Sequence, residues 1–151
     1  MTRYSLILFA VILGPPRPGA PPTTVAEFQA LRWLEGRWRG THEGEPFYQS
    51  YHFRNDSTID TRAFGDSTFH AASDSGMILL EQGVVKNRGG GAEWEATSLD
   101  SRSVHFEPRK EAQISFTWHR ISRTQWSATI RWRDASGLER HQLYMLDRVG
   151  S

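Results

Sequence analysis

The stretch Leu34-Glu35-Gly36-Arg37-Trp38-Arg39-Gly40 decides the fold that this sequence predicts. It follows a short helix-like run and precedes a long series of strand-like segments. An indole at Trp38 can fill the narrow end of an antiparallel barrel. A guanidinium from Arg148, in the last strand-like segment, can stack on that indole and donate to nearby carbonyl groups. The pattern therefore predicts a barrel whose first and last strands meet through Gly36, Trp38 and Arg148.

From Gly36 onward the side chains alternate between apolar and polar, which is typical of strands. Residues 67–76 are expected to be a loop or a short edge strand, and residues 77–86 one long apolar strand with a bulge at Gly83. Another expected strand begins at Gly36. The remaining ones span 47–54, 58–64, 93–99, 103–107, 113–121, 125–133 and 138–149. The sequence thus predicts an all-β, up-and-down antiparallel barrel of about eight to ten strands, closed or nearly closed, with a two-sheet sandwich as the rival.

The N-terminal region is interpreted as an export signal, a linker and a short helix. Residues 1–20 are expected to be a signal peptide or an anchor, because Arg3 precedes the apolar run from Ser5 to Gly14. That run is too short to span a bilayer, which takes roughly twenty residues. Residues 21–26 are expected to be a linker and residues 27–151 the barrel domain. Export would place the protein in the periplasm or outside the cell, with no stable membrane span once the signal is cleaved.

The start of the expected helix carries its own signals. Thr24-x-x-Glu27 is typical of a capping box. The apolar residues expected on one face of that helix are Val25, Phe28, Leu31 and Leu34.

Composition excludes several classes of protein. The net charge is +1 and charged residues make up 23% of the chain, so no nucleic-acid partner is expected. Cysteine is absent, which excludes disulfides and cysteine-based metal sites. No His-x-His or His-Glu-x-x-His spacing occurs, so no metal site is predicted. The oligomeric state is left open by the sequence.

Three segments carry a resemblance to a known superfamily. FQALRWLEGRWRG, VHFEPRKEAQISFTWHRI and YMLDRV resemble the lipocalin-like, or calycin, superfamily, and within it a bacterial family of unknown function. The resemblance covers roughly residues 28 to 149, with Gly36, Trp38 and Arg148 matching at the superfamily level. It implies a barrel of eight to ten strands that binds small apolar molecules, and it implies no catalytic residue.

Strand alternation predicts which side chains line the interior. Residues two apart share a face of a strand, so aromatic side chains gather on one side of the late strands. The predicted ligand-binding residues are Tyr51, Phe116, Trp118, Trp126, Ile130 and Trp132. We therefore expect an exported protein that binds a small hydrophobic molecule, with catalysis not evident. The alternative is a structural, envelope-associated domain whose barrel is filled by its own side chains.

His141 is the candidate haem ligand. GRWRGTHEGE, together with His141-x-Leu143-x-x-Leu146-x-Arg148, is similar to the nitrobindins, haem-binding barrels in which a late-strand histidine holds the iron. That resemblance implies that His141 is the iron ligand of a haem protein or of a barrel-type enzyme. Strand alternation argues against this role. His141 and Arg148 are seven residues apart, so they point to opposite faces of a regular strand, and His141 points outward if Arg148 turns inward to meet Trp38.

Overall fold

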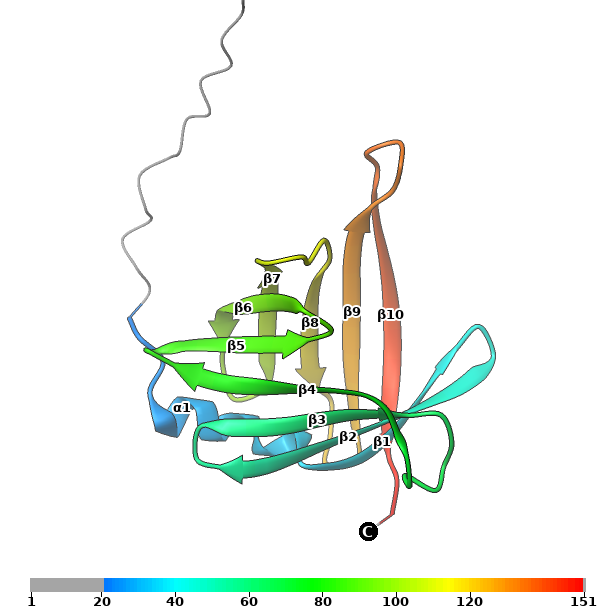
Figure 1. Cartoon of the computed structure of the whole chain (residues 1–151), viewed down its shortest axis with the longest axis horizontal. Coiled ribbons are helices and arrows are strands. Elements are labelled where there is room, and N and C mark those ends of the chain that lie inside the picture. Colours follow the sequence, from blue (N-terminus) through cyan, green and yellow to red (C-terminus); the bar gives the residue numbers. More distant parts are fainter. Residues whose placement is uncertain (1–20, 151) are drawn as a thin grey trace, which may run out of the picture.

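The computed structural model describes residues 21–150, which form ten strands and one short helical segment (Figure 1). The helical segment consists of α1 (Val25–Gln29) and the 3₁₀ turn η1 (Ala30–Leu34). The strands are β1 (Gly36–His42), β2 (Glu45–Asn55), β3 (Thr58–Phe64), β4 (Ala72–Glu81), β5 (Val84–Gly89), β6 (Ala92–Leu99), β7 (Ser103–Pro108), β8 (Ser115–Arg120), β9 (Gln125–Arg133) and β10 (Glu139–Arg148).

The strands close into a single antiparallel ring. Each strand pairs with its neighbours in sequence, and β1 pairs with β10, where Trp38 lies opposite Arg148. This confirms the all-β, closed up-and-down barrel with a short N-terminal helix and excludes the two-sheet sandwich. Closure satisfies backbone groups that would otherwise lie along free edges.

The helical segment covers one end of the barrel, which we call the helix end. The Thr24 hydroxyl accepts a hydrogen bond from the backbone N–H of Glu27 at 3.2 Å, and the Glu27 carboxylate accepts from the backbone N–H of Thr24 at 2.7 Å. This is the capping box that the sequence predicts. The side chains of this segment that are fully buried are Phe28, Leu31 and Leu34. Val25, which was expected on the same face, lies one turn earlier and is 48% exposed.

Residues just before the helix contact the barrel. The backbone N–H of Thr23 donates to the carbonyl of Gly83 at 2.8 Å. Gly83 has a φ of +76° and no room for a Cβ, which would clash with Pro22. The expected linker, residues 21–26, thus includes residues held against the β4–β5 turn. The expected signal peptide or anchor, residues 1–20, lies outside the described residues. No helix within residues 21–150 has the length and apolar character needed to cross a membrane.

Residues 67–86 differ from the expected strand pattern. β4 begins at Ala72, inside the expected loop, and ends at Glu81, inside the expected long strand. Gln82 and Gly83 then form a two-residue turn into β5, with φ values of 51° and 76°. Positive φ at both positions matches the twist of paired strands, so the turn makes a tight hairpin where a bulge was expected.

Aromatic side chains fill the helix end of the barrel interior. Trp126 meets three other indoles edge to face, with ring centroids 5.9 Å from Trp33, 6.0 Å from Trp38 and 5.4 Å from Trp118. Such edge-to-face pairs are favourable beyond the area that they bury. The half of the barrel away from the helix lacks this packing, and the candidate site lies there.

Candidate functional site

The barrel encloses a cavity of about 570 Å³ in the half that the helix does not fill. Its floor includes Trp126 and Leu146, each only 1% exposed. Its rim includes His42 and Asp74, which are exposed to solvent. The volume is typical of small-molecule sites. The protein's own side chains therefore fill the helix end of the barrel but not this half.

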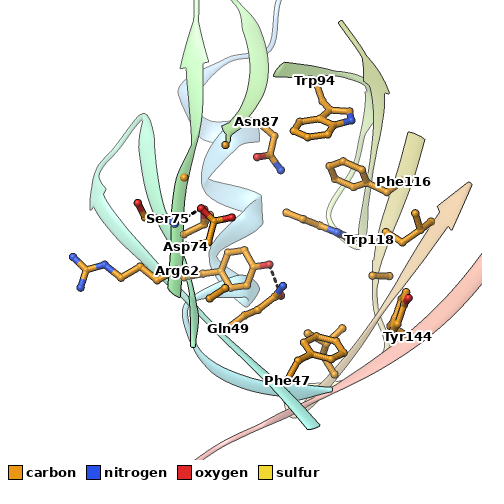
Figure 2. Close-up of a pocket in the computed structure, with 18 of the residues that line it drawn as sticks. Phe47, Gln49, Arg62, Asp74, Ser75, Asn87, Trp94, Phe116, Trp118 and Tyr144 are labelled. Carbon is orange, nitrogen blue, oxygen red and sulfur yellow. Dashed lines mark hydrogen bonds between the residues drawn. The ribbon is translucent and has the colours of Figure 1, made fainter. Parts of the chain in front are cut away.

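One wall of the cavity is aromatic and comes from β6, β8 and β9. Trp94, Phe116 and Trp118 lie one after another along this aromatic wall (Figure 2). The ring centroids of Trp94 and Phe116 are 5.6 Å apart, and those of Phe116 and Trp118 are 5.3 Å apart. Strand alternation explains the wall, since Phe116 and Trp118 share one face of β8, as Ala128 and Ile130 share one face of β9.

The wall opposite is polar and comes from β2 to β5, one residue from each strand. The residues of this polar wall are Gln49, Thr61, Asp74 and Asn87. Each lies two or four residues from a buried core residue of its own strand, which turns its side chain inward. Figure 2 shows Asp74 and Asn87 across the cavity from the aromatic wall.

Tyr51 orients the amide of the polar wall. Burial raises the pKa of Tyr51 well above its ordinary value, because the phenolate would lose its contact with water. The neutral hydroxyl donates to Gln49 Oε1 at 2.9 Å. Among residues 21–150, neither the Gln49 amide nitrogen nor the Asn87 side chain forms a further hydrogen bond. These amide groups are therefore available to a ligand.

Side chains, not backbone pairs, join β1 to β10 near the rim. In the described chain the two strands pair through two residues each, close to the helix end. Nearer the rim, Tyr144 Oη and His42 Nδ1 are 3.0 Å apart, and the Phe47 ring meets the Tyr144 ring edge-on at 5.8 Å. Phe47 can lie there because Gly40 has no side chain. A Cβ at Gly40 would clash with the Phe47 ring. We call Gly40, His42, Phe47 and Tyr144 the rim seam.

At the helix end, Arg148 reaches across the seam between the same two strands. Its guanidinium carbon lies 4.3 Å from the centre of the Trp38 ring. A Cβ at Gly36, where φ is +126°, would lie 2.5 Å from Arg148 Nη1. The guanidinium also donates to the backbone carbonyls of Glu35 at 2.7 Å, Arg123 at 3.0 Å and Trp33 at 3.3 Å. This arrangement places all three predicted barrel-closing residues in contact.

The structure brings five of the six predicted ligand-binding residues to the cavity. Those five are Tyr51, Phe116, Trp118, Trp126 and Ile130. Trp132 is the exception, since it is 36% exposed and does not line the cavity. It lies near the tip of the β9–β10 hairpin, which extends beyond the neighbouring strands (Figure 1). The part that the five residues play in binding stays a prediction.

His141 lies away from the cavity. It is exposed, and the cavity lining does not include it. Leu146, which is buried, lies five residues further along the same strand, so His141 faces outward as alternation indicates. The site therefore does not fit a haem held inside the barrel by His141.

Sequence reasoning missed all four residues of the polar wall. Gln49 could have been found, because it shares a face of its strand with Phe47, Tyr51 and Phe53. Thr61 could have been found in the same way, because it shares a face with Ile59. Asp74 and Asn87 could not, because each fell in a segment expected to be a loop or a turn, where alternation assigns no face.

Comparisons with known proteins find only weak similarities. No protein-family model matches the chain, and no curated protein matches it. Among solved structures, the chain is similar to EF1p2_mFAP2b bound to DFHBI, with 14% identity and a TM-score of 0.43 over 80% of this chain and 98% of that one. It is also similar to a redesigned β-barrel, b11L5F_LGL, with 16% identity and a TM-score of 0.38 over 81% and 96% of the two chains.

Proposed function

We propose that this protein is an exported binding protein that holds a small, mostly apolar molecule inside its barrel. The cavity of about 570 Å³ with its aromatic wall carries the proposal. Burying an apolar ligand there gains about 25 cal/mol for each Å² removed from water. A preformed cavity also lowers the ordering cost of binding. The resemblance to lipocalin-like barrels supports the same function.

A fluorescence titration with Nile red, a neutral apolar dye, tests the proposal. Ala63 faces the cavity from β3, so Ala63→Phe is expected to fill part of it and weaken binding at least tenfold. Ala135→Phe adds the same ring in the exposed turn between β9 and β10 and is the matched control. Saturable binding to the unaltered protein and the control, but not to Ala63→Phe, supports the proposal. Absence of saturable binding, or equal binding to all three proteins, contradicts it.

Export is the second part of the proposal, and the apolar run from Ser5 to Gly14 supports it. The expected product is a shortened protein outside the cytoplasm, measured by cell fractionation and by the mass of the purified chain. Leu8→Arg interrupts the apolar run and is expected to keep the full-length protein in the cytoplasm. Full-length protein in the membrane fraction would contradict cleavage and indicate an uncleaved anchor.

A further inference from the structure

We infer that the cavity selects a flat aromatic ring system that is neutral or positively charged, and that it disfavours anions. This inference rests on the proposed binding function and names the class of ligand. It depends on three features of the described residues: the rings of one wall, the amides of the other, and the distribution of charge around the opening.

The aromatic wall favours flat ligands. Trp94 Nε1 already donates to the carbonyl of Ile114 at 2.8 Å, so its polar group is satisfied within the protein. The ring planes of Phe116 and Trp118 are tilted by 33° to one another, so they are closer to parallel than to edge-on. Aromatic pairs in stacked or edge-on geometry are favourable beyond the area that they bury. A rigid ring system uses this surface better than a flexible chain, which loses more conformational freedom on binding.

The polar wall favours a ligand that has hydrogen-bonding groups along one edge. The amides of Gln49 and Asn87 lie on strands β2 and β5 and supply both donors and acceptors. A wholly apolar ligand would bury these amides without a partner, which is unfavourable. A ring system with nitrogen or oxygen on one edge can meet both walls at once.

The charges around the cavity disfavour an anion. Two cationic side chains border it among residues 21–150, Arg62 and Arg88, and both stand on outward-facing strand positions. Arg62 points away from the cavity (Figure 2). Arg88 donates to Glu93 at 2.6 Å and to Glu81 at 3.1 Å, so its charge is already paired.

Two further groups with acid–base chemistry lie near the opening. The Asp74 carboxylate belongs to the polar wall, and its Oδ1 accepts a hydrogen bond from the backbone N–H of Ser75 at 2.8 Å. His42, in the rim seam, is hydrogen-bonded to Tyr144. An entering anion would meet the negative charge of Asp74 without a free arginine or lysine pointing into the described cavity. A cation would be attracted to the same carboxylate.

Two dyes with the same three-ring body test the inference. 9-Aminoacridine is a cation with hydrogen-bonding groups, and anthracene-9-carboxylate is an anion. We expect the unaltered protein to bind 9-aminoacridine at least tenfold more tightly by fluorescence titration. Asp74→Asn should reduce this preference about fivefold, and Asn87→Asp should increase it by a similar factor. Both substitutions keep the shape of the side chain.

Matched controls place the same charge changes far from the cavity. Asp56→Asn and Asn55→Asp lie in the exposed β2–β3 turn at the helix end and are expected to leave the preference unchanged. Thermal unfolding of each variant checks that the fold is kept.

The outcomes separate this inference from the proposed function. A preference for 9-aminoacridine that follows the charge of residues 74 and 87 supports the inference. Equal or tighter binding of anthracene-9-carboxylate, tighter binding of the linear cis-parinaric acid, or a preference that the cavity variants leave unchanged overturns the inference and leaves the binding function standing. If none of the three probes binds and Nile red does not bind, both proposals fail.

Discussion

Two tryptophans in the filled end of the barrel are equally buried but differ in hydrogen bonding. Trp38 and Trp126 are each 1% exposed. Trp38 Nε1 donates to the carbonyl of Leu34 at 2.7 Å. Within residues 21–150, Trp126 Nε1 has no hydrogen-bond partner. The ring packing of Trp126 therefore stabilises the barrel while its buried, unpaired N–H is unfavourable, and the comparison with Trp38 allows packing and hydrogen bonding to be separated.

Replacing each of these tryptophans with phenylalanine is expected to have unequal effects. Both substitutions leave space in the core, but Trp38→Phe also leaves the carbonyl of Leu34 buried without a donor. An unpaired buried polar group costs about 1–3 kcal/mol. Urea unfolding should therefore show Trp38→Phe to be less stable than Trp126→Phe by roughly that amount. Equal losses would mean that the hydrogen bond to Leu34 adds little.

Arg148→Lys should weaken the closure of the barrel although it keeps the positive charge. A lysine ammonium cannot reach three carbonyls in the planar geometry of a guanidinium while lying flat on Trp38. We expect a loss of about 2 kcal/mol in the free energy of unfolding. Arg131→Lys is the control, because Arg131 is exposed on the outer face of β9. A control that loses as much stability as Arg148→Lys would contradict this role for Arg148.

Among the secondary-structure elements on which the core depends, α1 and η1, with five residues each, are the shortest. A helix of five residues has little stability of its own and is held by tertiary packing. Its capping box fixes the point at which the chain turns toward the barrel, and the residues after it bury Phe28, Leu31 and Leu34. A defect in the cap is therefore expected to affect the whole fold.

Thr24→Ala tests this dependence. The substitution removes the hydroxyl that accepts from the N–H of Glu27, and loss of such a cap costs about 1 kcal/mol. Thr24→Ser keeps the hydroxyl and should be close to the unaltered protein. Thermal or urea unfolding measures both variants, and equal behaviour of alanine and serine would show that the cap does not stabilise the barrel.

Most of the helices and strands could be predicted from the sequence, while part of the candidate site could not. Alternation in 125–133 placed Trp126, Ala128 and Ile130 on one face, because a half-buried strand must alternate. The β4–β5 hairpin was missed because residues on both faces of 77–86 are apolar, and Gln82-Gly83 lacks the asparagine or aspartate usual in such turns. Without that register, Asp74 and Asn87 could not be assigned to the interior.

For the molecule as a whole, charged carboxylates stabilise the turns and the outer face of the barrel. Hydrogen bonds to these groups lower the pKa of each below its ordinary value. They are Asp66 with the Thr68 hydroxyl, Glu93 with the Arg88 guanidinium, Asp100 with the backbone N–H of Arg102, and Asp134 with the Ser136 hydroxyl. Because the unfolded chain lacks these partners, its carboxyl groups keep their ordinary pKa values.

Acid is therefore expected to destabilise the protein. The unfolded state takes up protons first as the pH falls through the ordinary carboxyl pKa range near 4, while the folded state stays ionised to lower pH. The contribution of these groups is complete above that range and is lost below it. Urea unfolding at pH 7, 5 and 3 should give similar midpoints at pH 7 and 5 and a lower midpoint at pH 3. A higher midpoint at pH 3 would contradict this account.

The meeting of β1 with β10 has a consequence for how the molecule assembles. The other pairings of the described strands join neighbours along the chain, whereas the hydrogen bond from Arg148 to Glu35 links residues 113 positions apart. Bringing such distant segments together carries a large entropic cost, and topologies with long-range pairing fold slowly. Until the tenth strand arrives, the first has an open edge that can pair with a neighbouring chain. Refolding from denaturant is therefore expected to give less native protein as the chain concentration rises, because a strand of a second molecule competes with β10 for the edge of β1.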